Sequence, residues 1–186
     1  MSKNKSTRMI ICILEIIALV ILDQVAKVWA VVRLENKPSI IIIDGAFELY
    51  YLPNGNTGAA FGMLQGHQWL FMFIAIIISL ALLFIIYCMP LNKRYNLIII
   101  TMTFIIAGGI GNMIDRIRLN YVIDFIYFSL INFPIFNVAD MYVSVGTTIL
   151  VILLLFYYKE ADVNLIERNI KETLGIKSKG IKNSGN

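Results

Sequence analysis

Four long apolar stretches decide the fold, and the most informative is the third: NLIIITMTFIIAGGIGNMIDR, at residues 96–116. Crossing the hydrocarbon core of a bilayer takes about 20 apolar residues, and this stretch is long enough, yet it ends on Asp115 and Arg116. The other three share its apolar character and run approximately over Met9–Val32, Gln68–Met89 and Met141–Tyr158. The sequence therefore predicts four membrane-spanning helices.

The composition supports a membrane protein and excludes several other classes. Of 186 residues, 59% are hydrophobic and only 15% are charged, whereas soluble domains average about 25% charged residues. Disordered, collagen-like and disulfide-rich secreted chains are excluded. With one histidine, two cysteines and no GxxxxGK[ST], HExxH or CxxC motif, we expect no metal, no cofactor and no nucleic-acid partner.

The distribution of basic residues predicts the orientation in the membrane. Eleven Lys and Arg residues fall on one side: Lys3, Lys5, Arg8, Lys93, Arg94, Lys159, Arg168, Lys171, Lys177, Lys179 and Lys182. The opposite side holds five: Lys27, Arg33, Lys37, Arg116 and Arg118. Because cytoplasmic segments carry the excess of positive charge, both termini are expected in the cytoplasm and the loops 33–67 and 117–140 outside.

The first outer loop carries signals for β-structure. Residues 39–43 and 46–52 flank the pair Asp44-Gly45, which favours a hairpin turn with positive φ. We therefore expect an all-α membrane protein with four transmembrane helices and a small extracytoplasmic β-hairpin platform, within about residues 33–67. Residues 1–158 form the predicted membrane domain. The charged segment 159–186 is predicted to form a cytoplasmic tail, a solvated helix that frays into disorder.

Four acidic residues fall at one level, near the outer face of the membrane. At about 1.5 Å per residue, Asp23 lies about 21 Å from the start of its stretch and Asp115 about 28 Å from the start of the third. Asp140 directly precedes the fourth stretch, and Asp124 lies in an apolar part of the outer loop. Charge within a membrane is costly and usually functional, so this convergence predicts a site at the outer leaflet.

Some of these charged residues have ordinary structural explanations. Asp23 and Lys27 are four residues apart, which favours an i,i+4 ion pair. Asn112 and Arg116 have the same spacing and could hold a ligand carbonyl or neutralise a carboxylate. The glycines at 108, 109 and 111 equally predict close packing between helices.

Asp124 and Asp140 differ, because neither has a basic residue within four positions. Two carboxylates that lie close together in a poorly hydrated place share one proton. One can then act as a base on water and the other as an acid toward a carbonyl, which is the chemistry of aspartic proteases. Helix capping or loop ordering explains two such aspartates equally well at this point.

Other functions also fit parts of the pattern. Glu15 and Asp23 within one stretch suggest a proton- or ion-coupled small transporter, although the acidic residues cluster at one face instead of lining a path. Intramembrane proteases of the presenilin or prepilin-peptidase type carry Gly-x-Gly-Asp, whereas Gly109-Ile110-Gly111 is followed here by Asn112. A non-catalytic lipid-binding scaffold is a further alternative.

Five motifs, taken in order, resemble those of one known family, the bacterial lipoprotein signal peptidases (signal peptidase II). They are Asp23-Gln24-x-x-Lys27, Asn56-Thr57-Gly58-Ala59-Ala60-Phe61, Gly108-Gly109-x-Gly111-Asn112-x-x-Asp115-Arg116, Val122-Ile123-Asp124-Phe125 and Phe136-Asn137-Val138-Ala139-Asp140. The resemblance covers approximately residues 9–158, while Glu15 and the tail after Lys159 match no motif.

The resemblance implies a membrane-embedded aspartic endopeptidase of the bacterial cytoplasmic membrane. Such an enzyme removes signal peptides from prolipoproteins, cuts before the diacylglyceryl-modified cysteine at the outer leaflet, contacts membrane lipids and is inhibited by globomycin-type peptides. It implies a catalytic dyad of Asp124 and Asp140. The residues implied to support the dyad and hold substrate are Asp23, Lys27, Asn56, Gly108, Asn112, Arg116, Asn137 and Ala139.

Overall fold

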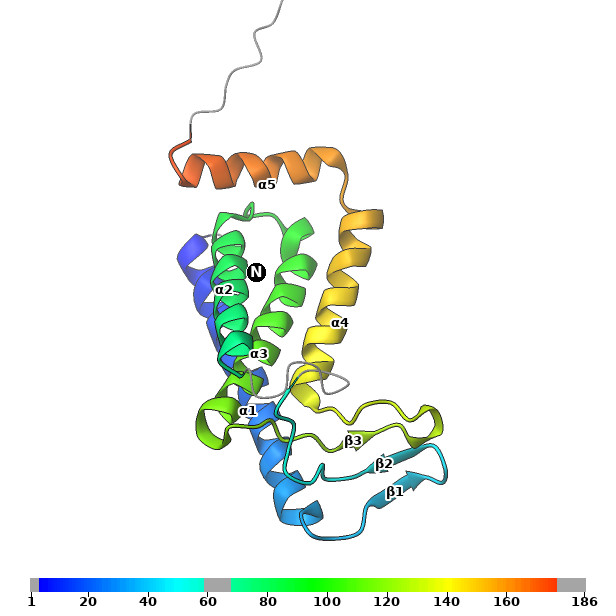
Figure 1. Ribbon diagram of the computed structural model, residues 1–186. Coiled ribbons are helices and arrows are strands. Elements are labelled where there is room, and N and C mark those ends of the chain that lie inside the picture. The colour runs from blue at the N-terminus through cyan, green and yellow to red at the C-terminus, as the bar shows by residue number, and fades with distance from the viewer. Residues whose placement is uncertain (1–3, 59–67, 177–186) are drawn as a thin grey trace, which may run out of the picture.

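Four long helices form the body of the molecule. The computed structural model describes residues 4–58 and 68–176, and Figure 1 shows the helices side by side. They are α1 (Lys5–Leu34), α2 (Gln68–Cys88), α3 (Asn96–Leu119) and α4 (Val138–Ile152), the last continuing as a π-helical stretch, Leu153–Tyr157. All four are long and apolar enough to cross a membrane, which confirms the four predicted spans.

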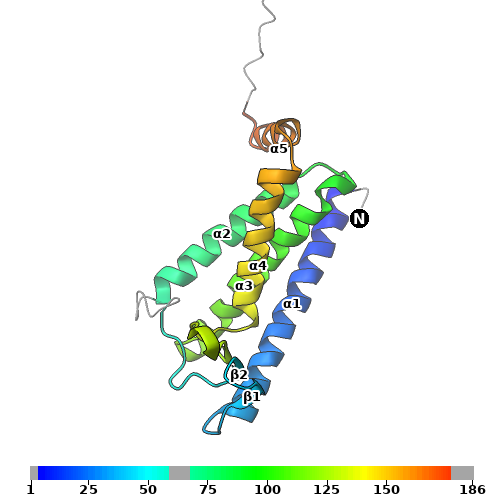
Figure 2. The ribbon, with the colours of Figure 1, turned by 90° about the vertical axis from the view of Figure 1, so that its right-hand side faces the viewer.

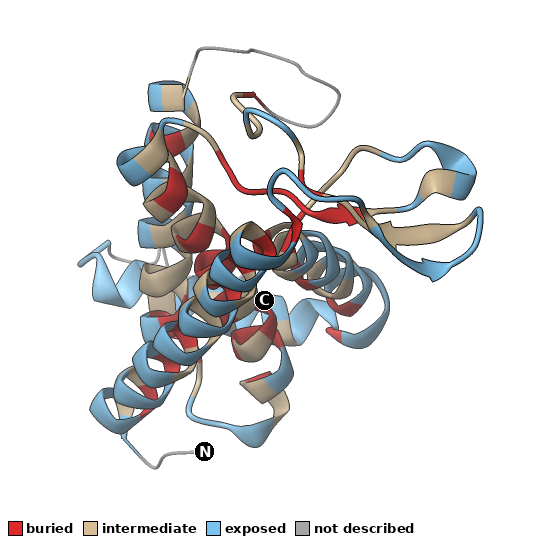
Figure 3. Cartoon of the chain, turned by 90° about the horizontal axis from the view of Figure 1, so that it is seen from below, coloured by how far each residue is buried: buried red, intermediate tan, exposed pale blue. Residues whose placement is uncertain are grey.

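Helix α3 is the centre of the bundle. Half of the residues in its most apolar part are buried, against 11–17% in the other three helices. Figure 2 shows α1 on one side of α3 and α2 on the other, with α4 in front. The buried residues gather on the inner faces of the helices and in the loop after α3 (Figure 3). The outward faces stay apolar and exposed, as expected of helices that face lipid.

A small antiparallel sheet marks one end of the bundle, here called the sheet end. Its strands β1 (Ile40–Ile43), β2 (Phe47–Leu49) and β3 (Ile126–Tyr127) follow the order β1-β2-β3. The predicted hairpin is confirmed, and Gly45 takes the positive φ of +66° at its turn. Strand β3, which no local sequence pattern predicts, pairs with β2 across a long sequence separation.

Helix α4 begins earlier than predicted, which changes the place of Asp140. The fourth span was expected to start at Met141, after Asp140, but α4 starts at Val138. The Asn137 side chain accepts from the Asp140 backbone N–H at 3.0 Å, and the Asp140 carboxylate accepts from the Asn137 N–H at 3.1 Å. This reciprocal cap satisfies two of the free donors at the start of the helix, and Asp140 lies in the first turn of α4.

The opposite end, here called the terminal end, carries both described chain ends. Helix α5 (Glu160–Thr173) lies across it, from α4 toward α2 (Figure 1). Arg94, in the short 3₁₀ turn Lys93–Tyr95, forms an ion pair with Asp162 at 2.8 Å, and Asn169 donates to the Cys88 carbonyl at 2.9 Å. The predicted tail helix is therefore present, but it is anchored to the bundle. The predicted fraying beyond it falls mostly on residues 177–186, outside the described part of the chain.

Candidate functional site

Asn137 joins the two aspartates that the sequence singled out. Its side-chain amide donates to Asp124 Oδ1 at 2.6 Å, and its backbone N–H donates to Asp140 Oδ2 at 3.1 Å. Asn137 stands at the start of α4 and Asp124 in the loop that leads to β3. The loop returns to the bundle because the Asp124 and Phe125 carbonyls accept from residues 52 and 50 beside the sheet. The fold thereby brings together two carboxylates that are 16 residues apart.

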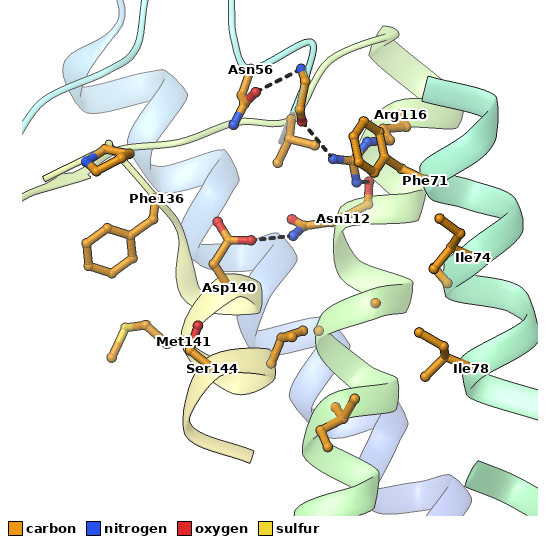
Figure 4. Close-up of a pocket in the computed structure, with 18 of the residues that line it drawn as sticks. Asn56, Phe71, Ile74, Ile78, Asn112, Arg116, Phe136, Asp140, Met141 and Ser144 are labelled. Carbon is orange, nitrogen blue, oxygen red and sulfur yellow. Dashed lines mark hydrogen bonds between the residues drawn. The ribbon is translucent and has the colours of Figure 1, made fainter. Parts of the chain in front are cut away.

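Two further asparagines complete the hydrogen bonding of the pair. Asn112 donates to Asp140 Oδ1 at 2.7 Å, and Asn56 donates to Asp124 Oδ2 at 2.9 Å. A dashed line in Figure 4 marks the hydrogen bond between Asn112 and Asp140. Each of the four carboxylate oxygens thus accepts an N–H from neutral groups, and among the described residues no cation forms an ion pair with either aspartate.

The environment of Asp124 favours its protonated form. Its side chain is only 1% exposed. Burial, followed by the nearby charge of Asp140, raises the pKa of Asp124 to about 7, while the hydrogen bonds from Asn56 and Asn137 oppose the rise. Buried carboxylates that repel one another in this way hold a proton between them near neutral pH.

Lys27 neutralises a second pair of buried carboxylates close by. Its ammonium lies 2.9 Å from Asp23 Oδ2 and 2.9 Å from Asp115 Oδ2, and all three side chains are at most 2% exposed. It also donates to Asn112 Oδ1 at 2.9 Å. The predicted i,i+4 ion pair of Asp23 and Lys27 is therefore confirmed. Asp115 is the second carboxylate that Lys27 binds.

Asp23 also ties α1 to the beginning of α4, at a place where the helices touch closely. Its Oδ1 accepts from the Ala139 backbone N–H at 2.9 Å. A Cβ at Gly111 would come within 2.5 Å of the Asp23 carboxylate, and one at Gly108 would overlap the Ala139 carbonyl oxygen. Both glycines are thus required for close approach, as the packing interpretation predicted.

Arg116 lies at the mouth of the cavity without an ion pair in the described part of the chain. Its guanidinium donates to the Gly58 carbonyl at 3.3 Å and stacks over the Phe71 ring at 5.2 Å, and its buried Nε has no hydrogen-bond partner there. Arg116 therefore makes no direct ion pair within the described residues, but its charge acts on Asp140 and Asp124 from a longer range. The other role considered from its spacing, holding a ligand carbonyl, stays a prediction.

Asp140 lines a cavity of about 570 Å³ between α2, α3 and α4, while Asp124 lies buried behind it. Its charged and amide side chains lie at the sheet end, at Asn56, Asn112, Arg116 and Asp140. Farther in, the walls are mainly aliphatic, with Ile74 and Ile78 of α2 facing α3 (Figure 4). Such a shape suits an apolar chain whose end reaches a polar reactive centre.

The sequence analysis assigned no role to Gln24. Its amide donates to Asp115 Oδ1 at 3.1 Å, to the Gly111 carbonyl at 3.2 Å and to Asp23 Oδ2 at 3.2 Å. The available signal was its position next to Asp23 in the first motif.

In residues 4–58 and 68–176, no three His, Cys, Asp or Glu side chains gather as a metal site requires.

Comparisons with known proteins give consistent matches. The family described as Signal peptidase (SPase) II matches residues 15–156. A lipoprotein signal peptidase of Clostridioides difficile is 41% identical over 78% of this chain and 95% of its own length, and one of Streptococcus pyogenes serotype M5 is 43% identical over 81% and 94%. A solved bacterial membrane enzyme has 30% identity and a TM-score of 0.64 over 92% of this chain and 94% of its own. These matches give the transporter alternative no support.

Proposed function

Because the chain belongs to the signal peptidase II family, we propose that it removes signal peptides from prolipoproteins as an aspartic endopeptidase. Family membership and four apolar helices make it a multi-pass membrane protease. The observation that carries the aspartic mechanism is that Asn137 binds both Asp124 and Asp140 while, among the described residues, only neutral groups donate hydrogen bonds to them. The cut falls before the diacylglyceryl-modified cysteine.

The two aspartates start the reaction with one proton between them. Burial and the nearby charge of Asp140 raise the pKa of Asp124, so the pair keeps one proton near neutral pH, and the surroundings of each side chain decide where that proton rests. Asp140 lies in the first turn of α4, where the positive end of the helix dipole favours a negative charge. We therefore assign Asp140 as the base and Asp124 as the acid.

Hydrolysis then proceeds by two proton transfers. Asp140 takes a proton from water as the water oxygen attacks the scissile carbonyl carbon, and Asp124 gives its proton to the carbonyl oxygen. The resulting gem-diol collapses as one of its hydroxyl protons returns to Asp124 and Asp140 protonates the leaving nitrogen. The C–N bond breaks, releasing the signal-peptide carboxyl and the amine of the modified cysteine, and the dyad again holds one proton.

The supporting residues fix the dyad instead of reacting. Asn56, Asn112 and Asn137 set the direction of the carboxylate oxygens and remain neutral throughout. Lys27, with its two carboxylate partners, anchors Asn112 on α3. A site that is already oriented requires little rearrangement in the transition state.

The proposed substrate geometry follows from the cavity. The signal-peptide helix lies along the aliphatic walls between α2 and α4, and Arg116 at the mouth meets peptide carbonyls near the cut. A globomycin-type peptide occupies the same cavity, and lipid acyl chains lie outside it. The excess of Lys and Arg at the terminal end supports placing both termini in the cytoplasm and the dyad at the outer leaflet of the bacterial cytoplasmic membrane. Residues 1–158 form the peptidase unit and residues 159–186 its tail.

The test uses a purified precursor in detergent, in its lipidated form and with the same cysteine unmodified. The wild type is expected to cut only the lipidated form, directly before the modified cysteine, as read by mass spectrometry, and globomycin is expected to stop it. The exposed turn residue Asp44 provides a control, because Asp44→Asn is expected to leave the rate unchanged. Full activity of Asp124→Asn, or a cut at another bond, would refute the proposal.

A further inference from the structure

Two hydroxyl groups in the cavity have no hydrogen-bond partner among the described residues. Ser79 of α2 and Ser144 of α4 both line it, and neither side chain makes a hydrogen bond within residues 4–58 and 68–176. By contrast, Thr101, Thr103 and Thr148 in the same bundle each donate to a backbone carbonyl of their own helix at 2.8 Å. An unpaired hydroxyl in a membrane-spanning helix costs free energy, so these two serines are the ones available to a ligand.

Both serines lie at about the same depth below the dyad. Ser144 is one turn after Asp140 on the same face of α4 (Figure 4), about 6 Å farther in. Ser79 packs beside Gly109, where a Cβ would lie 3.8 Å from the serine Oγ. Gly109 is three residues before Asn112, which places this contact about 4.5 Å farther in than Asn112. The two hydroxyls therefore flank the cavity on different helices, near one level.

A signal peptide has a specific need for donors at this level. If its helix runs from the terminal end toward the dyad, its carboxyl end lies there, and the last four carbonyls of any helix lack intrahelical partners. Inside a membrane no water satisfies them, at a cost of several kcal/mol each. The scissile bond must also leave the helix to be reached by water and by the dyad.

We propose that Ser144 and Ser79 donate hydrogen bonds to the last free carbonyls of the bound signal-peptide helix, and so fix where that helix ends. This inference rests on the proposed function. An extended chain rises about 3.3 Å per residue, so the gap to the dyad admits about two residues. The serines are positioning residues that set which peptide bond reaches Asp124 and Asp140.

The test uses the near-equal size of threonine and valine: threonine keeps the serine hydroxyl, and valine has a methyl group in its place. Ser144→Val, Ser144→Thr and Ser144→Ala, with the same three changes at Ser79, are assayed for KM, kcat and cut position on the lipidated precursor. Loss of one hydrogen bond is expected to raise KM about fivefold in the Val and Ala variants, with kcat nearly unchanged because the bond persists in the transition state. The Thr variants are expected to stay near the wild-type KM.

Controls separate binding from folding. Thr148→Val, one turn farther along α4, removes a hydroxyl that the helix already satisfies and is expected to leave KM unchanged. The midpoint temperature of thermal unfolding is also compared for all variants, because a substitution at a purely structural residue would lower it.

Wild-type KM values in both Ser144→Val and Ser144→Thr, or a wild-type KM in Ser144→Ala, would overturn the inference while the proposed function stands. If the steric bulk of both Val and Thr blocks substrate, the Ala variant alone decides. A wild type that fails to cut the lipidated precursor would overturn the proposed function itself, and this inference with it.

Discussion

The two ends of the helix bundle both hold polar clusters, but they balance charge in different ways. At the terminal end, buried Arg8 donates to three backbone carbonyls at the end of α2, at 2.8–3.1 Å. Arg94 meets both oxygens of Asp162 at 2.8 Å. Arg94 and Asp162 neutralise one another, while Arg8, whose buried Nε has no partner in the described residues, is held by carbonyls, and the result is a clamp that joins helices.

At the sheet end, carboxylates outnumber the cations that bind them. Lys27 binds both Asp23 and Asp115, whereas Asp124 and Asp140 accept hydrogen bonds only from amide groups within residues 4–58 and 68–176. Buried acids left without a counter-ion have strongly altered proton affinity, which is common where chemistry takes place. The comparison therefore separates a structural end from a reactive end.

The largest expected effect comes from replacing a dyad carboxylate. Asp124→Asn and Asp140→Asn are expected to lower kcat about 10³-fold or more, because a general acid or base contributes about 10²–10⁴ in rate. Asp162→Asn at the terminal end is the matched control and should keep nearly full activity. Turnover of the lipidated precursor is measured for all three variants. A kcat of either dyad variant within tenfold of the wild-type kcat would contradict the functional difference between the sheet end and the terminal end.

The second effect is on stability and comes from Lys27. Lys27→Met leaves Asp23 and Asp115 buried without their counter-ion, and breaking a buried pair in this way costs about 3–5 kcal/mol. The free energy of unfolding in detergent measures the loss. Arg94→Met removes a cation from the more exposed cluster and should cost much less. Equal losses in the two variants would contradict the difference drawn between the ends.

A smaller effect is a shift in pH dependence. The pKa of Asp124 is about 7 in the folded protein, so between about pH 4 and 7 the folded chain keeps a proton that the unfolded chain has released. The stability contributed by this group therefore falls as pH rises through that window, and above it the dyad loses its shared proton and the rate declines. The pH dependence of kcat/KM should be bell-shaped.

The variant Asn56→Ala tests whether loss of the shared proton causes the decline in rate at alkaline pH. The hydrogen bond from Asn56 lowers the pKa of Asp124, so Asn56→Ala should move the alkaline limb to higher pH. A flat profile in the wild type, or a downward shift in Asn56→Ala, would be inconsistent with proton sharing.

The smallest expected effect is at Asp162. Hydrogen bonds from Arg94 and from the Lys159 backbone lower the pKa of Asp162 to about 2. A lowered pKa contributes stability above the unfolded value near 4, and this contribution disappears as pH falls toward 2. Thermal unfolding should show a slight loss in Asp162→Asn at pH 7 that vanishes near pH 2, and a loss of equal size at both pH values would exclude the ion pair as its cause.

Much of the fold could be predicted because its signals are local. Four apolar stretches specify the helices by length and composition, and Asp44-Gly45 specifies the hairpin turn by backbone conformation. The start of α4 was misplaced because the apolar run alone was followed, although Asn137 and Asp140 have the spacing of a reciprocal cap. The docking of α5 and the pairing of β3 depend on contacts distant in sequence, which no local pattern encodes.

The candidate site was predictable in membership but not in its connections. Depth along the helices placed four carboxylates at one level, and the motifs named the asparagines. That Asn137 would bind both Asp124 and Asp140, or that Lys27 would bind Asp115 on another helix, depends on how α1, α3 and α4 approach one another. Close contacts at glycines determine how these helices pack. The spacing of the glycines in the sequence predicts such contacts but not the relative orientation of the helices.

The central claim is that Asp124 and Asp140 hold one proton between them, and infrared difference spectroscopy of the carboxyl C=O stretch tests it most directly. At pH 6 the wild type should show one protonated carboxyl that Asp124→Asn lacks, and its band should titrate near pH 7. A spectrum at pH 6 in which both side chains are ionised, or in which the band persists unchanged in Asp124→Asn and Asp140→Asn alike, would contradict the account.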